Sequence, residues 1–256
     1  MPGTILSRVA GALFVAAVMT LTLPAASAQQ FSDEQKRELH DIIRDYLINN
    51  PRVLQEAIAS LERMHEEQQM SELKAAVRDN ADRLFRSELD HVAGNPDGSI
   101  TMVEFFDYNC GFCKRSVSDV VSLIDTDPDL RVVLKEFPIL GPNSVFASRA
   151  AIAARKQGKY WEFHLAMMRA RGTNDPAQVM RIAEEVGLDT DQLEADMNAP
   201  EVDQTIEQSF ALANAMGIQG TPAFIIDDHL IAGALGLDAL RTQIEDVRAS
   251  GGCVAC

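Results

Sequence analysis

The segment ITMVEFFDYNCGFC (residues 100–113) decides the fold. Its first seven residues are mostly apolar and include β-branched and aromatic side chains, which predicts a strand. Two cysteines three positions apart, Cys110 and Cys113, follow almost directly. Apolar residues then recur at helical spacing, at Val117, Val120, Val121 and Ile124. The sequence therefore predicts a strand, a C-x-x-C pair at a helix start, and a helix.

The elements downstream extend this pattern. Residues 130–137 have strand character, which gives a β–α–β order with parallel strands and a right-handed crossover. A helical stretch follows over about 144–216, then strands over 223–226 and 230–232, and a last helix over about 237–249. A C-x-x-C pair in such a unit indicates a thioredoxin fold. We therefore predict an α/β thioredoxin fold that carries a helical insertion.

The cysteine pair predicts disulfide exchange without a cofactor. Exchange needs a thiolate that attacks and a second thiol that resolves the mixed disulfide. A helix N-terminus stabilises a thiolate, and such motifs lower a thiol pKa from about 8.5 to roughly 3.5–7.5. We expect Cys110 to be the nucleophile, exposed at the mouth of the helix, and Cys113 to be the resolving thiol.

Further residues are candidates for this site. Thr221-Pro222 precedes the third strand, where a cis proline would face the cysteines and offer backbone groups to substrate; an ordinary trans turn is the alternative. We expect Gly111 and Phe112 to contact substrate as well. Glu104 interrupts an apolar strand and could move protons for Cys113 if buried, or face solvent on an edge strand.

The zone from about Phe31 to Leu89 is predicted to be helical. Ser32 and Gln35 fit a capping box, and Pro51 starts a second helix. That helix is long, and its stripes of apolar residues are narrow: Leu54, Ile58 and Leu61, then Leu73, Val77 and Leu84. Such helices often pack against a partner helix. We favour an oligomerisation stalk with a polar middle at residues 65–69; a helix lying across its own domain is the alternative.

The N-terminus has the features of a secretory signal. Arg8 precedes the apolar run from Val9 to Leu23, and Ala26-Ser27-Ala28 fits a cleavage site. An uncleaved membrane anchor is the alternative, but the run is short for a span of about 20 residues. We expect an exported chain without membrane insertion after cleavage. Its net charge of −15 argues against nucleic-acid partners.

We expect a signal peptide at 1–28, a helical oligomerisation segment at 29–92, a thioredoxin domain at 93–250 and a flexible tail at 251–256.

The four cysteines form two C-x-x-C pairs, and the second is Cys253 and Cys256 in this tail. The tail pair is a candidate for Cu(I), which soft thiolates select. A zinc site joining both pairs, or a plain tail disulfide, is the alternative. Methionines 167, 168 and 216 and His164 are expected to be packed core residues.

From about Ile100 to Ala249 the chain resembles the DsbA-like periplasmic disulfide oxidoreductases. The resemblance rests on residues 103–106, the first C-x-x-C pair, residues 137–140, the helical insertion and Thr221-Pro222; the tail pair is not part of it. The helical zone before Ile100 is similar to that of the suppressor-of-copper-sensitivity protein C (ScsC) group. This resemblance implies a periplasmic trimer with disulfide isomerase or reductase activity. Where DsbA has Pro-His between its cysteines, this chain has Gly111-Phe112, so we predict a couple less oxidising than about −120 mV.

Three functions remain open from the sequence. An isomerase or reductase would act on misfolded exported proteins and would need a membrane thiol reductase. A dithiol oxidase of the DsbA kind would instead be reoxidised by a quinone-linked membrane partner. A copper-binding or copper-tolerance protein would use the tail pair, Cys253 and Cys256.

Overall fold

The computed structural model of this chain describes residues 31–256. The signal peptide expected at residues 1–28 lies outside the described residues. Within the described part, no helix is both long and apolar enough to cross a membrane.

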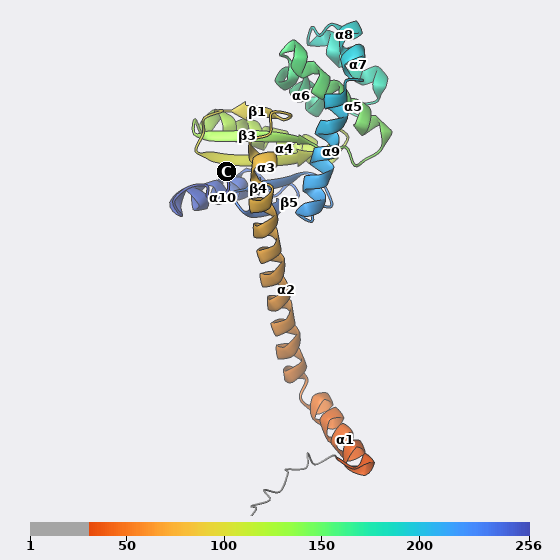
Figure 1. The fold of residues 1–256 in the computed structure, drawn as a ribbon, viewed down its shortest axis with the longest axis vertical. Coiled ribbons are helices and arrows are strands. Elements are labelled where there is room, and N and C mark those ends of the chain that lie inside the picture. The colour runs from red at the N-terminus through yellow and green to blue at the C-terminus, as the bar shows by residue number, and fades with distance from the viewer. Residues whose placement is uncertain (1–30) are drawn as a thin grey trace, which may run out of the picture. The chain divides into compact units, whose positions relative to one another are not determined.

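A five-stranded sheet forms the centre of the fold, in the order β1-β3-β2-β4-β5 (Figure 1). β2 pairs parallel with β3, and every other pairing is antiparallel. The strands span His91–Gly94 (β1), Ile100–Phe106 (β2), Leu130–Glu136 (β3), Ala223–Ile226 (β4) and His229–Ala232 (β5). The predicted β–α–β unit and the later strands are therefore confirmed.

Alternation along β2 divides the core between the two faces of the sheet. Ile100, Met102 and Phe106 lie in the same core as α4 (Gly111–Thr126) and α10 (Leu237–Ala249). Val103 and Phe105 instead pack into a second core, with residues of α2, α3 and α9. By the same alternation, Glu104 lies on the α4 face of β2.

The predicted helical insertion is present between β3 and β4. Figure 1 shows helices α5 to α8 gathered beside the sheet. The insertion spans α5 (Pro142–Ala154), the 3-10 turn η1 (Arg155–Gln157), α6 (Tyr160–Arg169), α7 (Pro176–Glu185), α8 (Thr190–Asp196) and α9 (Pro200–Ala215). Prolines begin α5, α7 and α9, as expected for a residue that lacks a backbone donor.

The chain forms two units, which divide between Ser60 and Leu61. The first contains α1 (Asp33–Asn49) and the start of α2 (Pro51–Asp79). The capping box of Ser32 and Gln35 is confirmed at the start of α1. The predicted polar middle of α2 is helical without a break.

The second unit holds the rest of α2, the sheet and the insertion. Val77 of α2 is fully buried, and Lys74 forms an ion pair with Asp228 at 3.1 Å. α3 (Ala81–Phe85) follows and buries Leu84. The C-terminal end of α2 and the short helix α3 thus pack within this unit, α2 through Leu73 and Val77 and α3 through Leu84.

One strand, β1, was not predicted. Its four residues, His-Val-Ala-Gly, give too short an alternation to indicate a strand. β1 lies across the boundary expected between residues 92 and 93. Gly94 ends it with φ +74°, where a Cβ atom would stand 2.6 Å from the Leu130 carbonyl oxygen. Glycine is therefore required at this position.

Candidate redox site

Cys110 stands at the N-cap of α4, between the end of β2 and the helix. The Cys113 backbone N–H donates to Cys110 Sγ at 3.4 Å, so the sulfur takes the place of a capping oxygen. Both cysteines are free thiols in this structure. The predicted strand, cysteine pair and helix are thus arranged as the sequence indicated.

The pKa values of the two thiols are shifted in opposite directions. Hydrogen bonds from Cys113, from Thr221 and from the backbone N–H groups of Cys113 and Phe112 lower the pKa of Cys110 to about 5, although burial opposes them. Burial, and then the hydrogen bond to Cys110, raise the pKa of Cys113 well above its usual value. At neutral pH Cys110 is therefore a thiolate and Cys113 a thiol.

Cys110 is less exposed than the sequence suggested. Its side chain is 6 % exposed, and Cys113 is fully buried. The Thr221 loop lies against the sulfur, with the Thr221 carbonyl oxygen 3.2 Å from Cys110 Sγ. The expectation of an exposed sulfur was wrong because this loop comes from 111 residues further along the chain.

Glu104 is buried beneath α4 and does not lie on an edge strand. Its side chain is 3 % exposed, and β2 is flanked by β3 and β4. Burial, and then the charge of Cys110, raise the pKa of Glu104 to about 8. A group with this pKa exchanges a proton readily near neutral pH.

The loop before β4, which contacts Cys110 through Thr221, also borders a groove. The Thr221–Pro222 peptide bond is cis, and the loop lines a groove of about 270 Å³ with Leu230 and Ala232 of β5. Phe112, two residues after Cys110, is 59 % exposed. The Arg115 guanidinium lies 4.2 Å from the centre of its ring. Thr221 and Phe112 are thus accessible to a peptide, whereas the Pro222 side chain is buried beneath the loop.

Several polar residues that the sequence analysis missed hold the loop before Cys110. The buried Asp107 carboxylate accepts hydrogen bonds from the backbone N–H groups of Asn109 and Leu140. Tyr108 donates to Glu136 at 3.0 Å and lies 3.1 Å from His164 Nδ1. The sequence does contain a signal for Glu136: it is a glutamate in an apolar strand, which is the same signal that identified Glu104.

Glu136 is a second buried carboxyl group near the cysteines. It accepts hydrogen bonds from Tyr108 and, at 2.7 Å, from Tyr160, and burial raises its pKa to about 8. His164 is buried within this network, and burial lowers its pKa to about 3. The expectation that His164 and methionines 167, 168 and 216 are packed core residues is confirmed.

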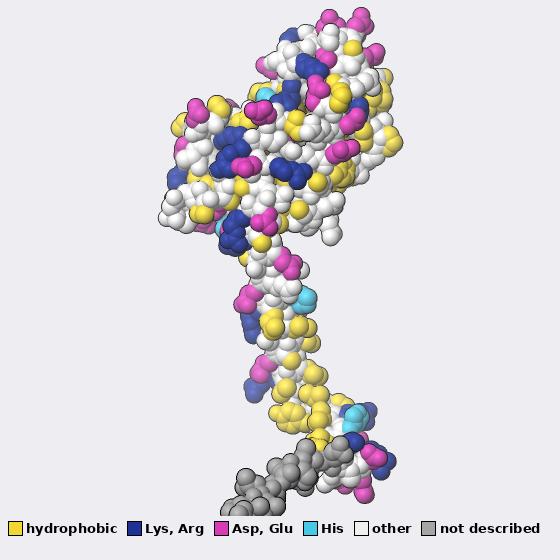
Figure 2. All heavy atoms as spheres, viewed as in Figure 1, with side chains coloured by type: hydrophobic (Ala, Val, Ile, Leu, Met, Phe, Trp, Pro, Cys, Tyr) yellow, Lys and Arg dark blue, Asp and Glu magenta, His cyan; other side chains and the backbone are white. Residues whose placement is uncertain are grey.

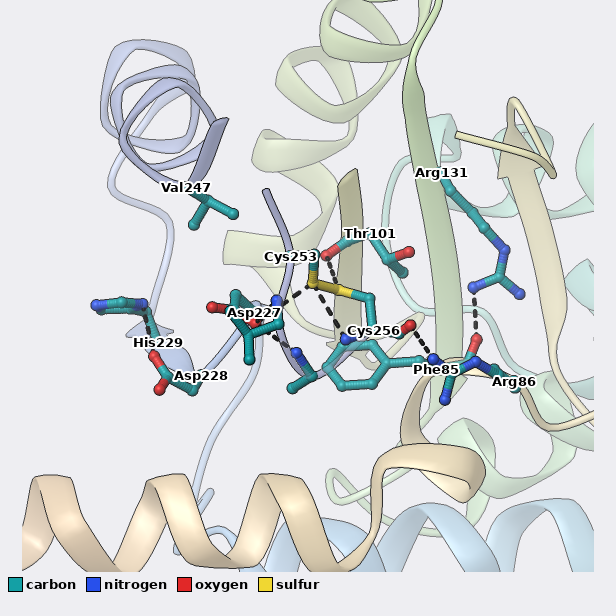
Figure 3. Close-up of a disulfide and its surroundings, with 12 residues drawn as sticks. Phe85, Arg86, Thr101, Arg131, Asp227, Asp228, His229, Val247, Cys253 and Cys256 are labelled. Atoms are coloured by element: carbon teal, nitrogen blue, oxygen red, sulfur yellow. Dashed lines mark hydrogen bonds and ion pairs between the residues drawn. A yellow bond between two sulfur atoms is a disulfide. The ribbon is translucent and has the colours of Figure 1, made fainter. Parts of the chain in front are cut away.

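The tail pair lies elsewhere and is oxidised. Cys253 and Cys256 form a disulfide beside Asp227 and Thr101 (Figure 3). Cys256 Sγ lies 3.8 Å from the carbonyl oxygen of Thr101 at the start of β2, whereas Cys110 follows the end of β2. The five residue steps of strand from Thr101 to Phe106 span about 16 Å. The two pairs therefore cannot share one zinc ion, and that alternative is excluded.

The tail is also better packed than expected. Ala255 is buried, and the backbone N–H groups of Val254 and Ala255 each donate to Asp227 Oδ1 at 2.8 Å. Arg86 donates to the Cys256 carbonyl oxygen. The structure thus differs from the flexible tail expected at residues 251–256, because Asp227 satisfies backbone donors that would otherwise face water.

Comparison with protein families identifies the domain. The model of the DSBA-like thioredoxin domain matches residues 101–245, more than half of the chain. This chain belongs to the DSBA-like thioredoxin domain family. A second model, of the copper resistance protein ScsC N-terminal domain, matches residues 35–68 of this DSBA-like protein. The protein thus combines a DSBA-like thioredoxin domain with N-terminal helices similar to those of ScsC.

Solved structures agree with this assignment. A thioredoxin-like oxidoreductase from Silicibacter pomeroyi DSS-3 is 49 % identical, covers 66 % of this chain and 97 % of its own, and has a TM-score of 0.65. A linker-deletion mutant of Proteus mirabilis ScsC is 26 % identical and covers 88 % and 100 %, with a TM-score of 0.67. A periplasmic thioredoxin-like protein from Salmonella enterica serovar Typhimurium is 27 % identical and covers 66 % and 95 %, with a TM-score of 0.59.

Curated relatives carry a different name. The Na(+)/H(+) antiporter NhaA of Herminiimonas arsenicoxydans is 28 % identical over 162 residues, which are 63 % of this chain and 26 % of the antiporter. The chain spans about a quarter of the length of the curated relatives it matches.

Proposed function

We propose that this protein is a periplasmic disulfide isomerase or reductase that acts on exported proteins through Cys110 and Cys113. The observation that carries the proposal is the combination of a Cys110 sulfur at the N-cap of α4, where its pKa is lowered, with an apolar helical face that residues 31–256 leave uncovered. The first supplies the exchange chemistry. The second would bring several such sites together around one substrate.

The exchange chemistry uses the acidity difference between the two thiols. The Cys110 thiolate attacks a substrate disulfide, which forms a mixed disulfide and releases one substrate thiolate. Cys113 then loses its proton and attacks Cys110 Sγ, which releases the second substrate thiolate. We assign the acceptance of the Cys113 proton to Glu104, which is buried on the α4 face with a pKa of about 8.

Substrate contact is assigned to the residues around Cys110. The cis Thr221–Pro222 loop and its groove would receive an extended peptide, since backbone groups there can pair with a strand. Gly111 has no side chain to obstruct Cys110, and the exposed ring of Phe112 offers an apolar contact. In an isomerase the substrate remains bound while Cys110 is displaced by another substrate thiol.

The N-terminal helices support assembly into a homo-oligomer, which we take to be a trimer. α1 has no buried residue, and its apolar side chains are 46–65 % exposed at Leu39, Ile42, Ile43 and Tyr46. Figure 2 shows further hydrophobic side chains along α2, where Leu54, Ile58 and Leu61 are 44–57 % exposed. Amphipathic helices with such faces pack against copies of themselves.

The dithiol oxidase is the competing function. It would use the same cysteines, kept oxidised by a quinone-linked membrane partner, whereas an isomerase needs a membrane thiol reductase. The dipeptide between the cysteines favours the isomerase, because the side chain of Phe112 cannot donate a hydrogen bond to the Cys110 thiolate as a histidine side chain would. Copper tolerance would require reduction of the tail pair, since a disulfide offers no thiolate to Cu(I).

Refolding of scrambled ribonuclease tests the proposal. The intact protein should restore ribonuclease activity, and Cys110→Ser should abolish this effect. Ile42→Glu in the full chain, which places a charge on the apolar face of α1, should reduce isomerisation but preserve simple reduction of a small disulfide. No isomerisation by the intact protein, together with a redox potential near about −120 mV, would establish the oxidase instead.

A further inference from the structure

The C-terminal tail is folded against the turn between β4 and β5. α10 ends at Ala249, and Gly251 and Gly252, with φ of +110° and +95°, turn the chain back towards the sheet. Val254 and Ala255 then donate their backbone N–H groups to Asp227 Oδ1. This arrangement fixes Cys253 and Cys256 on either side of two anchored peptide groups.

The sulfur atoms gather around the Asp227 carboxylate (Figure 3). Cys253 Sγ lies 3.4 Å from Asp227 Oδ1, and the Cys256 backbone N–H donates to Cys253 Sγ at 3.2 Å. One ligand atom from each of Asp227, Cys253 and Cys256 lies within 4.8 Å of the other two. The three groups are therefore close enough to bind one tetrahedral metal ion once the bond between the two sulfur atoms is broken.

Asp227 is placed for such a role. It is 7 % exposed, and among residues 31–256 no lysine, arginine or histidine forms an ion pair with it. Its φ of +55° is uncommon for a residue other than glycine. The hydrogen bonds from the tail involve Oδ1, which leaves Oδ2 to bind a cation. A buried carboxylate without a cationic partner is costly, and a metal ion would offset this cost.

We propose that Cys253 and Cys256, once reduced, form with Asp227 a binding site for a thiophilic divalent cation of the zinc class, and that the disulfide is the closed state of the same site. A dithiol, such as the reduced pair of another thiol–disulfide oxidoreductase, supplies two electrons and two protons and becomes a disulfide. The cation then binds both sulfur atoms and displaces the two thiol protons. Solvent occupies the fourth position.

The ligand set distinguishes this site from the Cu(I) site suggested by the sequence. Cu(I) is held by soft sulfur ligands, whereas Zn²⁺ accepts thiolate and carboxylate together. Two sulfurs and one carboxylate oxygen therefore favour Zn²⁺ or Cd²⁺. The Cys256 N–H to sulfur hydrogen bond adds stability to a bound thiolate.

Metal titration of the full chain with Cys110→Ser and Cys113→Ser tests the proposal, because the tail pair then holds its only thiols. After reduction by a phosphine, Cd²⁺ should bind once per chain, with a cadmium–thiolate absorption band and release of two protons. Zn²⁺ should displace the Cd²⁺, and reoxidation should abolish binding. No binding by the reduced chain, or binding that survives Cys253→Ser and Cys256→Ser, would overturn the proposal.

Asp227→Asn separates the three-ligand site from a pair of thiolates alone. Asparagine keeps the oxygen that accepts the tail N–H groups but removes the charge, so Cd²⁺ affinity should fall at least about tenfold, the lower range for residues that merely support ligands. Asp228→Asn is the matched control, because Asp228 pairs with Lys74 and should leave affinity unchanged. Equal affinity in both variants would overturn the role of Asp227.

X-ray absorption at the zinc edge gives a readout that needs no substitution at the site. The zinc-loaded chain should show two sulfur ligands at about 2.3 Å and oxygen ligands at about 2.0–2.2 Å. A shell of four sulfurs would show that two chains share the metal through their tail cysteines, and it would contradict a site completed by Asp227.

Discussion

At the scale of single residues, Cys110 and Glu104 have pKa values shifted in opposite directions. Hydrogen bonds to the sulfur lower the pKa of Cys110 to about 5, whereas burial raises that of Glu104 to about 8. At neutral pH the pair therefore holds its proton mainly on the carboxyl group. This arrangement keeps a reactive thiolate beside a group that can accept or return a proton.

The first prediction concerns the pH dependence of alkylation. Because only the thiolate reacts, the rate of Cys110 alkylation by iodoacetamide in the reduced protein should be nearly constant from pH 9 to 6 and fall as pH drops through about 5. Mass spectrometry of the labelled Cys110 peptide would follow the rate. Cys253→Ser and Cys256→Ser should leave the midpoint unchanged. A midpoint near 8.5 would refute the assigned acidity.

The second prediction concerns Glu104. Glu104→Gln removes the proton acceptor, so resolution of the mixed disulfide by Cys113 should slow by about 10²-fold, the lower end for general base catalysis. Stopped-flow measurement of mixed-disulfide decay would detect the change. Glu136→Gln is the control, since Glu136 is equally buried but contacts Tyr108 and Tyr160. Equal slowing in both variants would indicate a structural effect.

At the scale of elements, a buried ion pair joins β3 to the segment before β1. Lys135 and Asp90 have side chains 0 % and 1 % exposed and are in direct contact. Lys135 also donates to the Arg83 carbonyl oxygen at 2.6 Å. Burial lowers the pKa of Lys135 and raises that of Asp90, although each opposes the shift of the other.

The third prediction follows from this pair. Lys135→Met should destabilise the protein by about 3–5 kcal/mol, because it leaves the Asp90 charge buried and unpaired. Lys135→Met with Asp90→Leu should recover much of that loss. Urea unfolding followed by circular dichroism would measure both. Arg181→Met, at an exposed pair with Glu185, should change stability little. A double variant as unstable as the single one would contradict this account.

Most elements were predictable because local patterns determine them. The apolar run of β2, the cysteine cap of α4 and the prolines at helix starts all act over a few residues. β1 was missed because four residues carry too little pattern. The burial of Cys110 and the packing of the tail were missed for another reason: Thr221 and Asp227 reach these sites from distant parts of the sequence.

At the scale of the whole molecule, the apolar residues on α1 and α2 that residues 31–256 leave exposed are the basis of the proposed assembly. Leu39, Ile42 and Tyr46 are 46–65 % exposed in a chain whose second unit has its own buried core. Burial of hydrophobic side chains at this spacing between packed copies of the helix would stabilise an oligomer.

The fourth prediction tests this assembly directly. Ile42→Glu should convert the oligomer to single chains, about a third of the mass if the oligomer is a trimer, because a charge cannot be buried in the helix interface. Light scattering coupled to gel filtration would measure the mass. Arg44→Glu, on the polar side of α1, should leave the oligomer intact. A single-chain mass for the unsubstituted protein would exclude assembly through these helices.

The placement of the two sulfur pairs near opposite ends of β2 has a consequence for electron storage. Within one molecule the pairs are too far apart to pass electrons directly, so each equilibrates with its surroundings on its own. A fully reduced molecule would thus carry four more electrons than a fully oxidised one, two in each cysteine pair. An equilibrium titration with glutathione should accordingly resolve two separate two-electron transitions, each abolished by substitution of its own cysteines.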